Sequence, residues 1–212
     1  MIMQKKFDEH FPDLKVKEGH MLLTDLTVET FTAIFNAPDI GVPKKILEIG
    51  FNAGHSAFGF LEMFPETVVH SIDLGRHTYT RPCAQKIQSI FGERFKFGVK
   101  NSHDITPDNI IGENYDMVYI DGDHSKKGIS NDYDICNKAK VEWILIDDYN
   151  LFRNIRELVD HIHISSDHPY TVRARIKFDN NVLLKDPEAK EHHRMTTAIL
   201  LQRTGTTDET IQ

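Results

Sequence analysis

Cysteine is scarce in this chain, and long apolar runs are missing from it. Only two of the 212 residues are cysteines, Cys83 and Cys136, and they lie far apart, outside any C-x-x-C pattern. This excludes a disulfide framework and a zinc ribbon, and it predicts reduced thiols in a cytoplasmic protein. The N-terminal residues MIMQKKFDEHF lack the apolar core of a signal peptide, and no apolar run has the length of a membrane-spanning helix.

An excess of positive charge is missing as well. The chain has 25 Lys plus Arg against 32 Asp plus Glu, a formal net charge of -7, and no concentrated basic stripe. Because contacts with phosphates dominate affinity for nucleic acids, this balance disfavours a DNA or RNA partner. A basic patch formed by folding keeps an RNA substrate open as an alternative. We expect a small-molecule substrate, no membrane partner, and a chain that could form a homo-oligomer.

Apolar runs of strand length alternate with amphipathic segments along most of the chain. The runs predict strands at 45–50, 68–72, 95–99, 115–121 and 141–147, and the segments between and around them predict helices at 24–36, 55–64, 82–91, 126–139 and 151–161. In the first helix, Thr24 is the expected N-cap, and the expected apolar stripe is Leu26, Thr30, Ala33 and Ile34.

The order of these segments predicts one α/β domain over residues 1–212. Near-continuous apolar strands separated by helices are typical of a mostly parallel, twisted sheet with helices on both faces. The tail differs, because segments 170–178, 182–184 and 195–202, with a turn-like DNN at 179–181, are expected to be antiparallel at one edge. The expected parts are an N-terminal helical cap region (1–40), a core (44–150) and the antiparallel strands (165–204).

A glycine loop follows the first predicted strand. Gly50 and Gly54 allow a tight turn and close approach to a ligand, and Ser56 lies near the start of the next helix, where an anionic group can bind. The dinucleotide fingerprint G-x-G-x-x-G fails because Asn52 occupies its middle glycine position, which disfavours a nucleotide-dependent dehydrogenase. No Lys-Ser or Lys-Thr pair follows, so the loop is not a P-loop. The alternative is a tight strand-to-helix turn without a ligand.

Polar residues also follow the second and third predicted strands. The carboxylate of Asp73, next to Leu74, has the position and the spacing from Gly50 of an acid that accepts hydrogen bonds from both ribose hydroxyls. The alternative for Asp73 is a turn or capping residue. Ser102 lies in the segment Asn-Ser-His after the third strand, which is either a contact for a nucleoside base or an ordinary loop.

Acidic residues end the fourth and fifth predicted strands. Asp121 and His124 belong to the sequence DGDH, and Asp147 and Asp148 to the sequence DDY. Carboxylates that meet at one sheet edge repel one another unless a cation neutralises them, and hard oxygen ligands suit Mg²⁺ (or Mn²⁺). The alternative for Asp147 and Asp148 is a pair of helix-capping acids.

These motifs resemble those of class I S-adenosylmethionine-dependent methyltransferases. The loop E-x-G-x-x-x-G-x-S resembles the first motif of the class. The segment YDMVYIDGDHSKKGISNDYDIC with WILIDDYN resembles the metal-dependent O-methyltransferases related to macrocin O-methyltransferase and cephalosporin hydroxylase-like proteins. The catechol O-methyltransferase group has a similar three-ligand arrangement. EGHMLLTDLTVETF resembles the helix before the cofactor loop, so the similarity covers roughly residues 18–158.

The resemblance implies a Rossmann-like methyltransferase domain and a role for each motif. Asp121, Asp147 and Asp148 match metal positions, and His124 matches a position near the substrate, so Asp121 and His124 are the expected catalytic residues. S-adenosylmethionine is the expected cofactor, and its expected contacts are Glu48, Gly50, Asn52, Gly54, Ser56, Asp73, Leu74, Ser102 and Asp121.

The expected function is metal-assisted O-methylation of a small hydroxylated substrate. Two alternatives stay open at this point. An N-methyltransferase acting on protein or RNA would keep the cofactor loop but would have no need of the metal acids. A module that binds S-adenosylmethionine without catalysis would keep the same binding residues.

Overall fold

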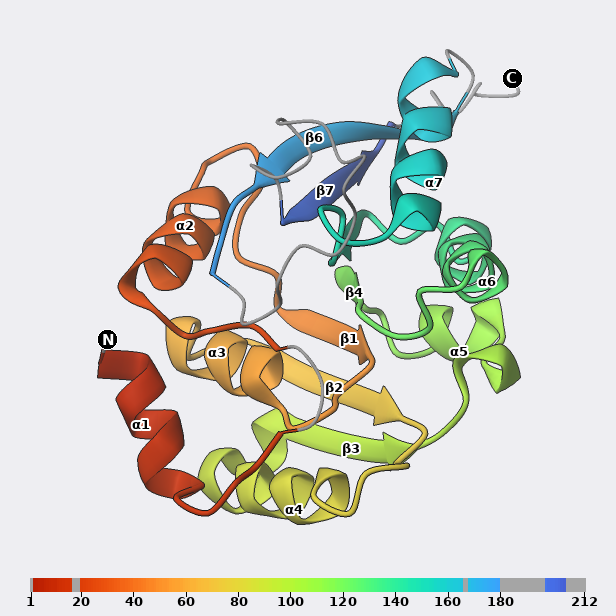
Figure 1. The fold of residues 1–212 in the computed structure, drawn as a ribbon. Coiled ribbons are helices and arrows are strands. Elements are labelled where there is room, and N and C mark those ends of the chain that lie inside the picture. The colour runs from red at the N-terminus through yellow and green to blue at the C-terminus, as the bar shows by residue number, and fades with distance from the viewer. Residues whose placement is uncertain (1, 17–19, 166–167, 180–196, 205–212) are drawn as a thin grey trace.

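The central feature of the computed structural model, which describes residues 2–16, 20–165, 168–179 and 197–204, is a seven-stranded sheet (Figure 1). Its order is β3-β2-β1-β4-β5-β7-β6; the first five of these strands are parallel, and β7 pairs antiparallel with both β5 and β6. The prediction of a mostly parallel sheet with an antiparallel C-terminal hairpin is confirmed. The strands are β1 (Lys45–Ile49), β2 (Val68–Asp73), β3 (Phe95–Val99), β4 (Met117–Ile120), β5 (Trp143–Ile146), β6 (Tyr170–Ile176) and β7 (Ala198–Arg203).

Helices cover both faces of the sheet, because its central strands are apolar on both sides. In β4, Met117 and Tyr119 enter one core cluster, and Val118 and Ile120 enter the other. Figure 1 shows α1 to α4 on one side and α5 to α7 on the other. None of the helices in the described part of the chain is long and apolar enough to cross a membrane. The helices are α1 (Ile2–His10), α2 (Asp25–Phe35), α3 (His55–Met63), α4 (Thr80–Phe91), α5 (Pro107–Ile111), α6 (Lys126–Lys138) and α7 (Arg153–Ile164).

Helix α2 begins where the sequence predicts but buries a different face. The Thr24 side chain accepts a hydrogen bond from the Thr27 amide at 3.4 Å, which confirms the N-cap. The buried residues are Thr27, Phe31 and Phe35, whereas Leu26 is 45% exposed. The predicted apolar stripe was therefore wrong, because two phenylalanines four residues apart bury more apolar area than the stripe that begins at Leu26.

The remaining differences concern short or terminal segments. Helix α5 has five residues and was not predicted, and α7 ends at Ile164, three residues after the predicted end. The predicted strand at 182–184 and most of the DNN turn lie outside the described residues.

The parallel register brings the ends of the first five strands to one edge of the sheet. Ile49 pairs with Ile72 on one side and with Ile120 on the other, and Ile120 pairs with Ile146. The residues that follow these four positions are the glycine loop and the predicted acids. The sheet thus brings the glycine loop and the predicted acids to one edge, although they are far apart in the sequence.

We predict that Gly50→Ala lowers the free energy of unfolding more than Gly41→Ala does. Both glycines have positive φ, +97° and +78°, so both variants incur backbone strain of about 1–2 kcal/mol. A Cβ at Gly50 would also lie 2.0 Å from the Asp121 carbonyl oxygen, whereas a Cβ at Gly41 meets nothing within 4 Å. Urea unfolding should give Gly50→Ala an additional loss of about 2 kcal/mol or more. Equal losses in the two variants would contradict this account of Gly50.

Candidate active site

A cavity of about 640 Å³ opens at the edge of the sheet where the parallel strands end. It lies over the loops that follow β1, β2, β3 and β4. Six of the predicted cofactor contacts line it: Gly50, Asn52, Asp73, Leu74, Ser102 and Asp121. The cavity also has cationic side chains that sequence reasoning did not select, namely Arg76, Lys100 and Lys127.

Asp73 fixes the conformation of the glycine loop. One carboxylate oxygen accepts hydrogen bonds from the backbone amides of Phe51 and Asn52, at 3.0 and 2.9 Å, and the other accepts one from the Gly75 amide at 2.7 Å. Asn52 has a left-handed backbone, with φ of 50°. A carboxylate offers about four acceptor sites, so Asp73 keeps capacity for a further donor such as a ribose hydroxyl.

Three of the predicted cofactor contacts do not line the cavity. Glu48 is fully buried, and its carboxyl group accepts hydrogen bonds from the hydroxyls of Ser56 and Ser71. Burial raises the pKa of Glu48 to about 7. Gly54 is needed for packing, because a Cβ there would lie 2.5 Å from both Phe51 and Ile87. Glu48, Gly54 and Ser56 therefore support the glycine loop from inside the protein.

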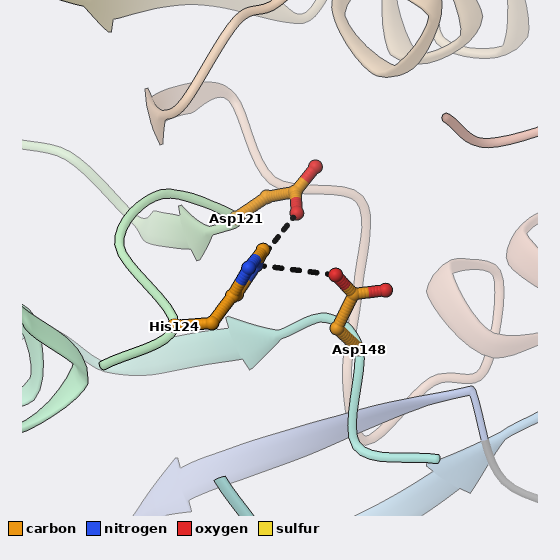
Figure 2. Close-up of side chains that lie close together, drawn as sticks. All are labelled: Asp121, His124 and Asp148. Carbon is orange, nitrogen blue, oxygen red and sulfur yellow. Dashed lines mark ion pairs between the residues drawn. The ribbon is translucent and has the colours of Figure 1, made fainter. Parts of the chain in front are cut away.

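Three ionisable side chains converge beside this cavity. Figure 2 shows Asp121, His124 and Asp148 pointing toward one another from the loops after β4 and β5. The Nε2 of His124 lies 3.6 Å from Asp121 Oδ1 and 3.1 Å from Asp148 Oδ2. The His124 ring stacks on Phe152, with 4.2 Å between the ring centroids. One potential ligand atom from each of the three converging residues lies within 4.8 Å of the others.

Asp147, predicted as the third metal ligand, is turned away from this cluster. One of its carboxylate oxygens accepts a hydrogen bond from the Tyr119 hydroxyl, and the other accepts one from the Asp148 amide at 2.6 Å. Tyr119 is fully buried, and burial raises its pKa well above the usual value. Within the described residues, the group of three potential ligands contains His124 and not Asp147. The sequence signal for including His124 in the group is its short spacing of three residues from Asp121.

The surroundings of the Asp121–His124–Asp148 cluster disfavour the negative charge of Asp148. Burial raises the pKa of Asp148 to about 8, and the neighbouring Asp147 and Asp121 add to the effect, while His124 opposes it. Asp148 also has a left-handed backbone, with φ of 57°. The Nε2 of His124 is buried and faces both of these carboxylates. Two carboxylates and an imidazole nitrogen form a donor set that fits a divalent cation.

Arg156 holds the loop that carries Asp148. It is buried in α7, and its guanidinium donates to the backbone carbonyls of Tyr149 at 3.4 Å and Asn150 at 3.2 Å. No motif in the sequence pointed to this role, because the contact joins a helical side chain to a loop backbone.

Comparison with known proteins gives a family match and a fold match. Residues 47–149 match a family described as a methyltransferase domain. No curated protein sequence matches the chain significantly.

Several solved structures share the fold at low sequence identity. A protein assigned as a caffeoyl-CoA O-methyltransferase from Staphylococcus aureus is 17% identical, with a TM-score of 0.57 over 95% of this chain and 91% of that one. One assigned as an RNA methyltransferase from Pyrococcus horikoshii is 13% identical, with a TM-score of 0.57 over 98% and 99%. One assigned as an O-methyltransferase from Klebsiella pneumoniae is 11% identical, with a TM-score of 0.55 over 96% and 89%. At these identities the likeness shows the fold alone.

We predict that Glu48→Gln stabilises the protein at pH 8 but not at pH 4.5. The pKa of Glu48 is raised from 4.5 to about 7 in the folded chain, so the folded state binds more protons than the unfolded state between these values. The contribution of Glu48 to stability therefore falls as pH rises through this window. The Gln side chain still offers one hydrogen-bond donor and one acceptor to the hydroxyls of Ser56 and Ser71. Urea unfolding at pH 8 should show a gain of about 1–3 kcal/mol over the unmodified protein, shrinking toward zero at pH 4.5.

Glu66→Gln is the matched control, because Glu66 is exposed. It should change stability little at either pH. A Glu48→Gln variant that is destabilised equally at both pH values would show that the buried carboxylate is satisfied when charged.

Proposed function

We propose a function that starts from the family match: residues 47–149 are a methyltransferase domain, as the resemblance to class I methyltransferases predicted. In this proposal, the domain transfers a methyl group from S-adenosylmethionine to a hydroxyl oxygen of a small molecule, assisted by a divalent cation. The observation that carries the proposal is the position of Asp121. It lines the cavity and is also part of the Asp121–His124–Asp148 cluster, so a substrate at the cluster would lie beside the cofactor.

The chain's own residues account for cofactor binding. The glycine loop, held by Asp73, would surround the methionine part, and Asp73 would accept hydrogen bonds from the ribose. Leu74 is 44% exposed at the cavity and offers an apolar contact to the base. A cavity of about 640 Å³ is within the range of small-molecule and cofactor sites.

Asp121, His124 and Asp148 would hold the cation. When bound, it would lower the pKa of a substrate hydroxyl and orient that oxygen. Because one of the three protein ligands is an imidazole nitrogen, the set favours a transition-metal ion such as Mn²⁺ over Mg²⁺, which prefers oxygen ligands.

The cluster also provides for the proton that leaves the substrate. The Asp121 carboxylate could receive it on the oxygen that does not bind the cation, whereas the Nε2 of His124 would be occupied by the cation. The stacking of His124 on Phe152 fixes the ring plane. Phe152 thereby limits the orientations in which the imidazole can meet the cation.

The cluster favours oxygen over nitrogen as the methyl acceptor. A neutral amine needs no cation to become a nucleophile, whereas a hydroxyl must lose its proton. The net charge of -7 and the acidic cluster disfavour a nucleic acid in the site. The fold does not choose between these acceptors, because the solved structures that share it include proteins assigned to both O-methylation and RNA methylation.

The cofactor is tested by binding. S-adenosylhomocysteine should bind the protein, and NAD should not bind measurably. Asp73→Asn should weaken binding by about tenfold or more, the scale for losing a charge-assisted hydrogen bond. Asp104→Asn is the control, because Asp104 is exposed at the same edge of the sheet and does not line the cavity. Titration calorimetry measures all these affinities, and tight NAD binding without a response to S-adenosylhomocysteine would overturn the cofactor assignment.

The cation is tested by Mn²⁺ titration and by turnover. Mn²⁺ binding, followed by electron paramagnetic resonance, should be lost in Asp148→Asn and kept in Asp160→Asn, an exposed site on α7. Conversion of S-adenosylmethionine with a panel of small hydroxylated compounds should fall at least about 100-fold in Asp148→Asn. The free energy of unfolding should not fall, because the raised pKa of Asp148 means that the folded protein disfavours its charged form.

Chelation separates the two roles of the site. A chelator should abolish turnover and leave binding of S-adenosylhomocysteine unchanged, since the cofactor loop and the cation ligands lie on different strand ends. Full turnover in the presence of the chelator would show that the cluster acts as a metal-free base.

A further inference from the structure

A buried acid in α6 is not used by the proposed mechanism. Asp132 is 0% exposed. Its Oδ1 accepts a hydrogen bond from the Asn131 side-chain amide at 3.1 Å, and within the described residues its Oδ2 has no hydrogen-bond partner. Burying a carboxyl oxygen without a donor costs free energy, so such an atom in a folded protein needs an explanation.

The unpaired oxygen lies just behind the wall of the cofactor cavity. Gly122 and Ser102 both line that cavity. A Cβ at Gly122 would lie 3.5 Å from Asp132 Oδ2. The 3₁₀ turn of Ser102–Asp104 packs on α6. Burial raises the pKa of the Asp132 carboxyl, and the Ser102 hydroxyl lowers it. The Ser102 hydroxyl is therefore near the Asp132 carboxyl.

The proposed cofactor places its base at this wall. The ribose would lie at Asp73, at the end of β2, and the base would extend from there toward Leu74 and Ser102, which line the same cavity. The group of adenine that distinguishes it from other purines is the 6-amino group, a hydrogen-bond donor. A residue that meets this group must present an acceptor.

We propose that Asp132 is a positioning residue that makes the Ser102 hydroxyl an acceptor toward the cavity and so selects adenine over a 6-oxopurine. A serine hydroxyl has one proton and two lone pairs. When the proton is donated to Asp132 Oδ2, only lone pairs face the cavity. The 6-amino group can then donate to Ser102, whereas a 6-oxo group would place two acceptors against each other. The inference rests on the proposed function, because it concerns the base of S-adenosylmethionine.

Asn131 makes the polarity of this arrangement testable. Its amide donates to Asp132 Oδ1. In Asp132→Asn, the same donor would hold the new amide oxygen at that position, which turns the new NH₂ group toward Ser102. Ser102 would then accept from residue 132, and its own proton would be free to face the cavity. The single change thus reverses the hydrogen-bond polarity that the ligand meets.

The experiment compares two ligands by titration calorimetry, S-adenosylhomocysteine and its deaminated analogue S-inosylhomocysteine. The unmodified protein should prefer S-adenosylhomocysteine by at least about tenfold, the effect of one hydrogen bond of about 1.4 kcal/mol. Asp132→Asn should bring this ratio to one or below. Ser102→Ala removes the hydroxyl that joins Asp132 to the ligand. It should reduce the preference for S-adenosylhomocysteine without inverting it.

Asp134→Asn is the matched control. It removes the same charge from the same helix, two positions away, at an exposed residue. The variant should show the same ratio of affinities for S-adenosylhomocysteine and S-inosylhomocysteine as the unmodified protein.

A purely structural role for Asp132 would overturn the inference. In that case Asp132→Asn would weaken binding of both ligands equally and leave the ratio of their affinities unchanged. If Asp132→Asn does not fold, an unchanged ratio in Ser102→Ala has the same consequence. Failure of the unmodified protein to bind S-adenosylhomocysteine would instead refute the proposed function.

Discussion

The backbone of Gly50 lies against the carbonyl of Asp121, and the rest of the site depends on this contact. No room exists there for a Cβ, since the added atom would lie 2.0 Å from the carbonyl oxygen. The Asp121 amide in turn donates to the Ile49 carbonyl at 2.8 Å, so β1 and β4 stay paired to their last residues. The glycine loop and the first acid of the cluster are therefore held together by main-chain geometry. The side chains in the loops can vary without changing that distance.

Much of the fold could be predicted because the strands are short, apolar and buried on both sides. The runs MVYI of β4 and WILI of β5 are buried at every position, and such runs have few other interpretations in an α/β chain. The face of a helix is harder to predict. In α2 a weak stripe that began at Leu26 competed with Phe31 and Phe35, and only the tertiary partners Phe60, Phe64 and Phe178 decide between them.

The site could be located from the sequence, but the direction of each side chain could not. Asp147 and Asp148 are adjacent after β5, yet Asp148, which has a left-handed backbone, meets His124, whereas Asp147 meets Tyr119. Within a strand, successive residues point to opposite faces. The same limit applies to Glu48, which is one residue from a cavity-lining position and nevertheless faces Ser71 inside the protein. Sequence motifs locate the strand end, and the local backbone conformation decides which of two neighbours reaches the cavity.

The position of β7 has a consequence for how the chain can fold during synthesis. Strand β5 pairs with β7, and the two are separated by more than fifty residues of sequence, whereas β5 already has its parallel partner β4. Until residues 198–203 leave the ribosome, the apolar strand WILI has an open edge with unpaired backbone groups, which is a template for association with other chains. Chaperone protection would be needed longest at this edge, because closure there requires one of the most distant pairings in the sheet.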